Sequence, residues 1–326
     1  MSWDYRSYLG DEVFRELNYM KAFHPEYIEE ETADRKPVGY PHEKLVFAAA
    51  DHNARMINEY KGNPIGLSNR REYITRLFRE LQSDEVDGLE GAPDVIEDII
   101  LLNRIQKAGG GKDVLKKKML IGTVNRGGLK GTCWEMDDLP ACYTVERLQK
   151  LHMDGVKFMI RINPDDEKSR FQLRYLADTV NACEKAGLPI FIETLYFNTV
   201  DGKLVMRTDS ESLCKAVGVV SGLGCRGVGK WQEIPLNQEY AVPVSATTGP
   251  VLVVPDEIES EPMAIMEEYT CHIGDHDNIR GTLLCRNIMY GENDPLPLCD
   301  AIARVWHYGT SPEEAYREAL AAFEKR

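Results

Sequence analysis

The feature that most constrains the fold is a regular alternation of short apolar runs with longer amphipathic stretches. Each run is too short for a buried helix and is bounded by polar residues, glycine or proline. The eight runs cover residues 45–51, 86–91, 118–124, 155–162, 188–195, 227–236, 250–256 and 279–285. Their hydrophobicity is mostly continuous rather than alternating, which is typical of strands in a parallel sheet with both faces covered.

The stretches between the runs carry apolar residues at spacings of three and four, as amphipathic helices do. The clearest are residues 71–81, 94–105, 170–187, 210–222 and 262–269. Ser210 is a suitable helix start and Gly187 a suitable helix stop. Eight strand-helix units predict an α/β fold that closes into a TIM (β/α)8 barrel. A doubly wound open sheet is the alternative, but ADHNAR follows the first run where that fold carries a glycine fingerprint.

The chain divides into an N-terminal extension, residues 1–43, and one barrel domain with C-terminal helices, residues 44–326. The extension contains one helical stretch, residues 11–20, followed by a polar segment. We expect it to cap the barrel bottom or a neighbouring subunit, and we expect a homo-oligomer. Helical stretches at residues 296–308 and 311–325 close the chain.

Composition narrows the classes of partner. The net charge is -14 at pH 7, which disfavours nucleic acid and anionic membrane surfaces. No apolar run approaches the roughly 20 residues that a transmembrane helix needs. The eight cysteines form no CxxC pair, and several lie in apolar runs, which is typical of reduced thiols in the cytoplasm. We therefore expect a cytoplasmic protein that acts on a small molecule.

Polar side chains follow the apolar runs, at the strand ends where barrels of this kind carry their chemistry. These positions are Asp51, His52, Asn53, Glu90, Asn125, Arg126, Arg161, Asn163, Glu193, Tyr196, Glu233, Asp256, Arg286 and Asn287. Any one of them could simply satisfy loop backbone. Because so many charges of both signs converge on one mouth, the set predicts a functional site.

Lys157 is a candidate of another kind, because it lies within a strand rather than at its end. Residues 157, 159 and 161 share one face, so an Arg161 that points into the mouth places Lys157 deeper in the barrel. Burial and a nearby arginine should lower the pKa of Lys157 and leave a neutral, nucleophilic amine. The structural alternative is a salt bridge from Lys157 to Asp51 or Glu193.

Several motifs carry a resemblance to a known group of enzymes over residues 45–291. They are AAADHNAR, EVDGLEGAPDVIEDIILL, IGTVNRGGLKGT, DGVKFMIRINPDD, SGLG and ATTGPVLVV. Together they resemble the class I aldolase superfamily, which includes deoxyribose-phosphate aldolase and tagatose-bisphosphate aldolase. The nearest likeness is to an aldolase-like subfamily linked to myo-inositol catabolism. The resemblance implies a TIM barrel, a lysine that forms a Schiff base, and a phosphorylated keto sugar or sugar acid as substrate, similar to 5-dehydro-2-deoxyphosphogluconate.

One stretch departs from that pattern. Relatives of this kind carry the imine-forming lysine on the sixth strand, two places after a tryptophan and two before a proline, where this chain has Glu233. Lys230 lies three residues lower and, by strand alternation, faces the opposite side. Lys157, on the fourth strand where transaldolases place their imine lysine, is then the favoured nucleophile.

Three functions follow as hypotheses. The favoured one is an aldolase-type lyase without a cofactor, in which Lys157 is the nucleophile and Asp51, Glu193 and Glu233 move protons. Its substrate and phosphate ligands would be His52, Asn125, Arg126, Arg161, Arg286 and Asn287.

The second is a metal-dependent sugar isomerase, epimerase or lyase. Its divalent metal would be held by Glu90, Glu193, Glu233, Asp256 and His52. The third is a non-catalytic barrel that binds a sugar phosphate.

Overall fold

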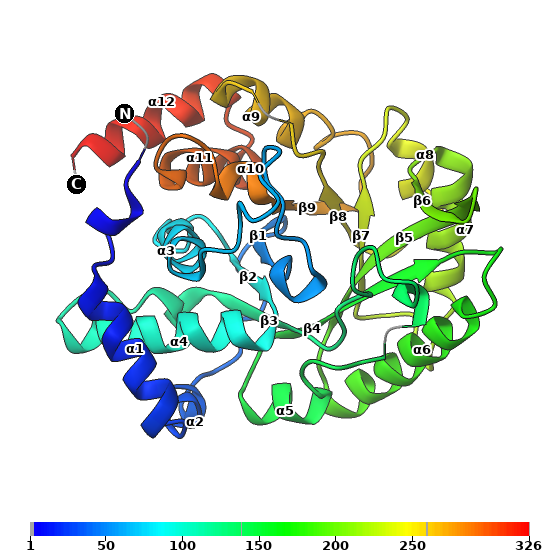
Figure 1. Ribbon diagram of the computed structural model, residues 1–326. Coiled ribbons are helices and arrows are strands. Elements are labelled where there is room, and N and C mark those ends of the chain that lie inside the picture. Colours follow the sequence, from blue (N-terminus) through cyan, green and yellow to red (C-terminus); the bar gives the residue numbers. More distant parts are fainter. Residues whose placement is uncertain (1–2, 138, 259, 326) are drawn as a thin grey trace.

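Eight parallel strands close into a barrel in a computed structural model that describes residues 3–137, 139–258 and 260–325 (Figure 1). Hydrogen-bonded neighbours run in the order β4-β3-β2-β1-β9-β8-β7-β5, and β4 pairs with β5 to complete the ring. The barrel strands are β1 (Leu45–Ala50), β2 (Gly88–Gly91), β3 (Met119–Thr123), β4 (Gly155–Ile162), β5 (Ile190–Val200), β7 (Lys230–Pro235), β8 (Val251–Val254) and β9 (Ile279–Leu284). The predicted TIM barrel and all eight of its strands are confirmed.

The continuous apolar runs are explained by burial on both faces of each strand. In β1, Leu45 and Phe47 belong to the apolar cluster inside the barrel, whereas Val46 and Ala48 pack outward against the helices. All four side chains are fully buried. A strand of this kind has no solvent-exposed face, so it shows no alternation in its sequence.

Every predicted helix of the barrel domain is present. They are α3 (Arg70–Glu80), α4 (Pro93–Ala108), α6 (Ser169–Ala186), α7 (Ser210–Ser221), α9 (Pro262–Thr270), α11 (Pro295–Tyr308) and α12 (Pro312–Glu324). Gly187 ends α6 in the left-handed conformation with a φ of 70°. α7 begins at Ser210, as predicted, and the Asp209 side chain caps it by accepting a hydrogen bond from the Ser212 N–H.

Several short helices join the longer elements. They are the α-helices α5 (Val145–Lys150), α8 (Ala241–Val244) and α10 (Arg286–Met289), and the 3-10 helices η1 (Tyr5–Ser7), η2 (Asn53–Arg55), η3 (Val114–Lys117) and η4 (Glu135–Asp137). No helix within the described residues is long and apolar enough to cross a membrane.

The N-terminal extension forms two helices, α1 (Asp11–Phe23) and α2 (Tyr27–Ala33), which pack against α4 on the side of the barrel. The sequence predicted only the first, because α2 is acidic and buries little. The chain then crosses the N-terminal ends of the strands, where Asp154 accepts a hydrogen bond from the Val38 N–H (2.7 Å) and pairs with Arg35 (2.6 Å). Residues 35–40 therefore cover the barrel bottom.

A β-hairpin that was not predicted extends one barrel strand. β5 continues past the barrel and turns at Asp201 and Gly202, which have positive φ angles of 49° and 72°, into the antiparallel strand β6 (Lys203–Arg207). Asp-Gly is a common turn sequence between paired strands. Phe197 and Leu204 of this hairpin pack with Met159 and Leu195, so an apolar cluster lines one side of the barrel mouth.

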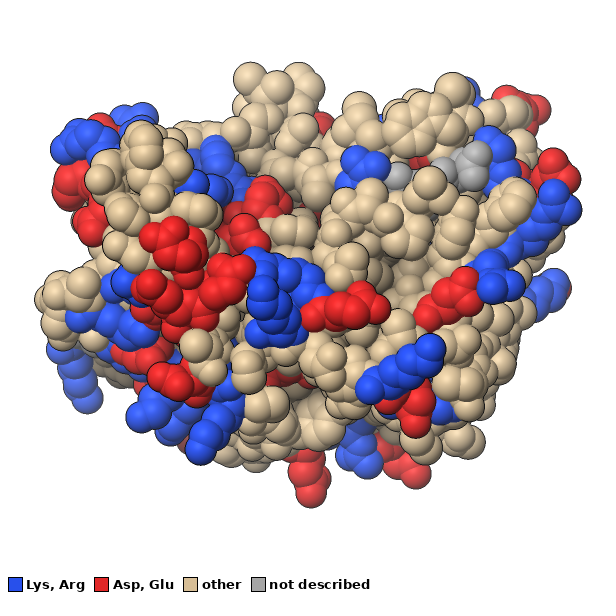
Figure 2. Space-filling model, turned by 90° about the horizontal axis from the view of Figure 1, so that it is seen from below, with Lys and Arg blue, Asp and Glu red and all other residues tan. Residues whose placement is uncertain are grey.

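Charges on the surface are interspersed. Figure 2 shows the face formed by α1, α2, α5 and α6, where acidic and basic side chains gather side by side around α1 and α2. Arg104 pairs there with Glu30 and Glu31, and Arg147 pairs with Glu29. On this face, the net negative charge therefore does not form one continuous acidic field.

Glu80, the last residue of α3, is a buried acid outside the barrel interior. It is fully buried, and neither carboxyl oxygen has a hydrogen-bond partner among the described residues. Burial raises the pKa of Glu80 well above its usual value, against a smaller opposing effect of Arg76. A raised pKa in the folded state means that stability falls as the pH rises above the pKa of the unfolded chain, about 4.3.

We predict that Glu80→Met stabilises the protein, because it replaces an unpartnered buried carboxyl with an apolar side chain of similar length. The free energy of unfolding should rise by about 1–3 kcal/mol at pH 8 and by less at pH 4.5, measured by urea denaturation. Glu16→Met, at an exposed position of α1, is the control and should stay within about 0.5 kcal/mol of wild type. A loss of stability at pH 8 would mean that Glu80 has a partner.

Candidate functional site

The inside of the barrel has an apolar floor and a polar layer above it. Phe47, Phe191, Trp231 and Leu252 are part of the floor. Side chains alternate along a strand, so the residue two places after each floor residue also faces inward, closer to the carboxyl ends. In β5 and β7 these residues are Glu193 and Glu233, which lie side by side in the sheet register.

Lys157 lies at the centre of the polar layer. Its Nζ atom is 3.1 Å from Glu90 Oε2, 3.2 Å from Glu193 Oε2 and 3.1 Å from Glu233 Oε2. The three acids come from β2, β5 and β7, so only barrel closure brings them to one lysine on β4. Lys157 is 2% exposed and Glu90 and Glu233 are fully buried, whereas 13% of the Glu193 side chain is exposed.

The charge state of Lys157 differs from the expected one. Burial lowers the pKa of Lys157, but Glu233, Glu90, Glu193 and Asp51 together outweigh burial and raise this pKa well above its ordinary value. The prediction of a lowered pKa and a neutral resting amine is therefore wrong. Its error was to count burial and Arg161 without the carboxylates that three other strands supply.

The acids around Lys157 titrate differently from one another. Burial, reinforced by Glu90, raises the pKa of Glu233 well above its usual value, and burial also raises the pKa of Glu90. Burial opposes the charged form of Asp51, yet Lys157 and Arg55 outweigh it and lower the pKa of Asp51 to about 2. The cluster therefore contains two carboxyl groups whose raised pKa values favour the protonated form, Glu233 and Glu90, and a carboxylate, Asp51, beside one ammonium group.

Lys230 does not reach this cluster. It points out of the barrel, and its Nζ donates hydrogen bonds to the carbonyl oxygens of Ser221 (2.5 Å) and Leu223 (3.0 Å) at the end of α7. Lys230 thus stabilises a helix C-terminus. Glu233, three residues on, faces inward at the position where the resembling enzymes carry lysine. The expected opposite orientation of the two side chains is what the structure shows.

Two of the arginines proposed as anion ligands form ion pairs with glutamates that were not among the predicted site residues. Arg161 Nη1 lies 2.7 Å from Glu135 Oε1. Arg286 makes a two-pronged contact with Glu257, with 2.9 Å between Nε and Oε1, and donates to the carbonyl of Glu59. Arg286 is thus held by an ion pair with a neighbouring acid, Glu257.

Sequence signals for the two glutamates were weak. Glu257 directly follows the predicted strand end, which could have drawn attention to it. Glu135 lies in the loop after β3, and nothing in the sequence indicates its partner. Arg126 is half-buried in the same loop.

The remaining predicted ligands are largely engaged with the protein itself. The Asn125 amide exchanges two hydrogen bonds with the backbone of Met159, at 2.8 and 2.9 Å. The Asn287 amide accepts from the Tyr269 hydroxyl and donates to the carbonyl of Ile258. His52 lies beside the mouth, and burial lowers its pKa to about 4, so the ring is neutral at physiological pH.

Three of the five alternative metal ligands, Glu90, Glu193 and Glu233, are brought together around Lys157, but Asp256 is not among them. Asp256 is exposed on the loop after β8, and the ammonium group of Lys157 lies among Glu90, Glu193 and Glu233. Only one group among the described residues has three metal-binding side chains whose ligand atoms lie within 4.8 Å of one another, and it is His42, Asp87 and His307. This group belongs to the opposite, N-terminal end of the barrel.

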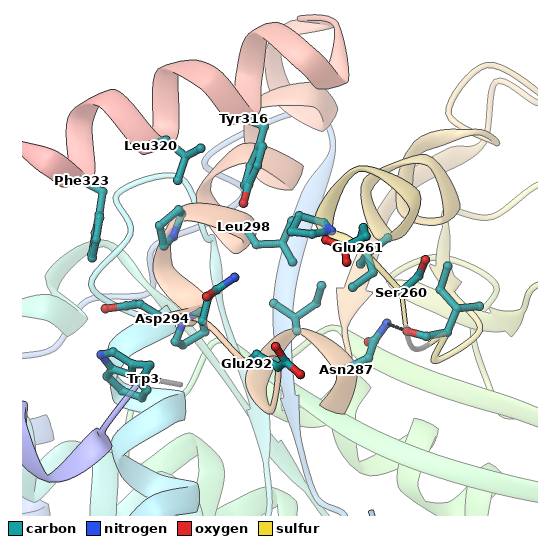
Figure 3. Close-up of a pocket in the computed structure, with 18 of the residues that line it drawn as sticks. Trp3, Ser260, Glu261, Asn287, Glu292, Asp294, Leu298, Tyr316, Leu320 and Phe323 are labelled. Atoms are coloured by element: carbon teal, nitrogen blue, oxygen red, sulfur yellow. Dashed lines mark hydrogen bonds between the residues drawn. The ribbon is translucent and has the colours of Figure 1, made fainter. Parts of the chain in front are cut away.

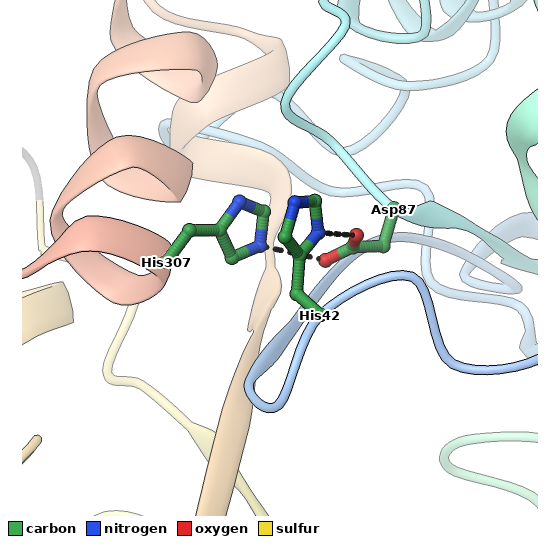
Figure 4. Close-up of side chains that lie close together, drawn as sticks. All are labelled: His42, Asp87 and His307. Carbon is green, nitrogen blue, oxygen red and sulfur yellow. Dashed lines mark hydrogen bonds and ion pairs between the residues drawn. The ribbon is translucent and has the colours of Figure 1, made fainter.

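The His42–Asp87–His307 group is better explained by hydrogen bonding than by metal binding (Figure 4). His42 Nδ1 lies 2.7 Å from one Asp87 oxygen and His307 Nε2 lies 2.9 Å from the other. The two rings stack with centroids 3.7 Å apart and planes 17° apart. An ion must lie close to the plane of each imidazole that binds it, and two nearly parallel rings at this separation share no such point.

A hollow of about 810 Å³ lies outside the ring of strands, bordered by α9, α11 and α12 (Figure 3). Tyr316, Leu320 and Phe323 of α12 face it, together with Leu298 and Trp3. None of the residues around Lys157 lines it. The candidate site is therefore the polar layer inside the barrel and not this hollow.

Solved structures support the assignment of the fold. Cgl0159 from Corynebacterium glutamicum (Brevibacterium flavum) is 29% identical with a TM-score of 0.82, over 92% of this chain and 99% of that one. An archaeal fructose 1,6-bisphosphate aldolase is 19% identical with a TM-score of 0.60, over 87% and 100% of the two chains. A Schiff base forming fructose-1,6-bisphosphate aldolase is 17% identical with a TM-score of 0.58, over 85% and 99%.

The two aldolase structures share the TIM-barrel fold with this chain. No protein of curated function matches the sequence. The family model described as Cgl0159-like covers residues 43–303, which include the whole barrel and every member of the lysine-carboxylate cluster. The chain belongs to the Cgl0159-like family.

Proposed function

We propose that the protein is an aldolase-type carbon-carbon lyase in which Lys157 forms an imine with the carbonyl group of its substrate. The observation that carries the proposal is a single buried amine inside the barrel in contact with Glu90, Glu193 and Glu233. Imine chemistry needs an amine with acids and bases within reach, and this cluster supplies them. No metal cofactor is part of the proposal.

The ammonium group must first lose a proton before it can attack. Glu193 is suited to accept that proton, because its carboxylate touches Lys157 and is the most exposed of the three. The free amine then adds to the carbonyl carbon, and the proton held by Glu193 passes to the carbonyl oxygen, which returns Glu193 to its carboxylate form. The nitrogen loses its second proton to give the carbinolamine, and this proton restores Glu233 after the next step. We assign to Glu233, whose raised pKa favours the protonated form, the donation of a proton to the departing hydroxyl, which leaves as water and yields the iminium ion.

Cleavage then breaks the carbon-carbon bond, and its electron pair moves toward the iminium nitrogen to give an enamine. A base must remove the hydroxyl proton of the departing fragment, which becomes a carbonyl. Glu193 is the candidate base. Asp51 has too low a pKa to be an effective base, so we assign it a fixed negative charge that stabilises the iminium cation.

We propose a phosphorylated keto sugar or sugar acid as the substrate, of the type of 5-dehydro-2-deoxyphosphogluconate in inositol catabolism. The proposal extends to a cytoplasmic homo-oligomer without nucleic-acid or membrane partners. Arg126, Arg161, His52, Asn125 and Asn287 remain the proposed substrate ligands, whereas Arg286 is withdrawn because three of its nitrogens bind Glu257 and the Glu59 carbonyl. Since Arg161 already pairs with Glu135, a substrate anion must exchange with this glutamate.

We predict that sodium borohydride added together with dihydroxyacetone phosphate, a small phosphorylated ketone, leaves a covalent adduct on Lys157. Reduction of the carbon-nitrogen double bond makes the adduct permanent, and peptide mass mapping locates it. Lys230→Met removes a buried lysine that faces away from the site and should leave the adduct in place, whereas Lys157→Met should abolish it. An adduct confined to another lysine, or turnover without any adduct, would contradict the role of Lys157.

The pH dependence of trapping provides a second prediction. Because the pKa of Lys157 is raised, the fraction of free amine and the trapping rate should climb as the pH becomes more alkaline. Glu193→Gln removes one of the charges that raise this pKa, so the increase in trapping rate with pH should occur at lower pH. The maximum trapping rate should fall about 10²–10⁴-fold in this variant, because the proton acceptor is lost. Asp256→Asn, at an exposed position of the barrel mouth, should leave the pH dependence of the trapping rate unchanged.

If Glu193→Gln leaves the pH dependence of the trapping rate unchanged, another group controls the deprotonation of Lys157. No adduct and no cleavage across a panel of phosphorylated keto sugars and keto acids would favour the non-catalytic barrel, in which the lysine-carboxylate cluster is structural.

A further inference from the structure

An ion pair between Arg161 and Glu135 lies above the polar layer, on the side of the barrel mouth. Arg161 lies on the inward face of β4, four residues beyond Lys157, and its side chain is 5% exposed. Its guanidinium also lies over the Phe197 ring, 5.6 Å from the ring centroid. Arg161 is thus held in place by a barrel strand and an aromatic ring from the neighbouring strand.

Glu135 reaches this arginine from a loop. It belongs to η4, in the segment between β3 and α5, and only 12% of its side chain is exposed. One oxygen lies 2.7 Å from Arg161 Nη1, and the other accepts a hydrogen bond of 2.9 Å from the Gly131 N–H. A guanidinium together with a backbone N–H is a typical set of donors for a phosphate or carboxylate group.

Glycines give the loop the shape that this contact requires. Gly128 has a φ of +95°, and a Cβ atom there would lie 2.3 Å from both Arg161 Nη1 and the Glu135 carbonyl oxygen. Gly131, which supplies the N–H, has a φ of +84°. Both backbone conformations strain any residue with a side chain, and the close approach at Gly128 leaves no room for one.

We propose that Glu135 occupies the place of the substrate's anionic group, so that a phosphate monoester displaces it from Arg161 and the Gly131 N–H. The inference rests on the proposed function, which places the reacting carbonyl at Lys157. Four residues of strand separate Lys157 from Arg161, roughly 13 Å along the backbone. Both side chains point inward, so a substrate that reaches from Lys157 toward the mouth brings its phosphate toward Arg161.

A phosphate is the stronger partner for this site, because it carries more negative charge and more acceptor oxygens than a carboxylate. Arg286 provides the contrast. Its guanidinium contacts both oxygens of Glu257 and also donates to the Glu59 carbonyl, so three of its nitrogens are engaged at once. The Arg286–Glu257 pair therefore serves as the control. It is an ion pair at the same barrel mouth, and we expect that a phosphate does not displace it.

Isothermal titration with D-glucitol 6-phosphate tests the proposal. This polyol phosphate has no carbonyl group and cannot form an imine, so its binding does not depend on the proposed chemistry at Lys157. Glu135→Gln removes the competing charge and should tighten binding about tenfold or more relative to wild type. Glu257→Gln should leave the affinity within about twofold, and Arg161→Met in the Glu135→Gln background should remove the gain. Unphosphorylated glucitol should show no gain in any variant.

Glu135→Asp is the second variant, because it keeps the charge but shortens its reach, and it should shift the affinity in the same direction by a smaller factor. Unchanged affinity in both Glu135 variants would overturn the proposal, as would a gain that survives Arg161→Met. A tightened affinity with no borohydride adduct on Lys157 would support the anion site and refute the imine, so the two proposals fail separately.

Discussion

The burial of acids inside the barrel depends on one cation. Glu90 and Glu233 are fully buried, and a carboxylate without a partner in such a place would cost several kcal/mol. The ammonium group of Lys157 offsets part of that cost by contacting both of them and Glu193. A single positive charge cannot balance all of these acids, and burial raises the pKa of Glu233 and of Glu90, which favours their neutral forms. Lysine and acids are therefore mutually dependent, and removing either leaves an uncompensated charge.

The same balance extends to the mouth of the barrel. Arg161 and Arg286 each have a glutamate beside them, so two of the three arginines that sequence alone offers as anion ligands are already neutralised. A chain with an excess of acids pairs its cations readily. Recognition of an anionic substrate then becomes a competition between the substrate and an internal carboxylate, which makes the choice of partner more selective than attraction to an exposed arginine would be.

The two ends of the barrel serve different purposes. At the N-terminal end, Asp87 and Asp154 are buried acids whose partners are histidines, an arginine and backbone N–H groups, and they fasten the extension and α11 to the strands. At the other end lie Lys157 with its acids and the loop that carries Glu135. This division agrees with the general rule that TIM barrels keep stability at one face and chemistry at the other.

Local pattern was sufficient for the architecture, because strand and helix periodicities are set by neighbouring residues. The eight apolar runs, the long helices and the opposite orientations of Lys230 and Glu233 all follow from spacing within one segment. The hairpin after β5 was missed although its Asp-Gly turn is a local signal. The sequence therefore determined the barrel and which side chains face its interior.

Tertiary structure alone decided the charge state and the partners. The pKa of Lys157 changes direction once Glu90, Glu193 and Glu233 lie about 3.1 Å away, and these acids come from strands far apart in the chain. The partners of Arg161 and Arg286 are set in the same way by loops that meet only when the barrel closes. Electrostatic effects depend on distance and burial in space, and spacing along the chain does not specify either one across a closed sheet.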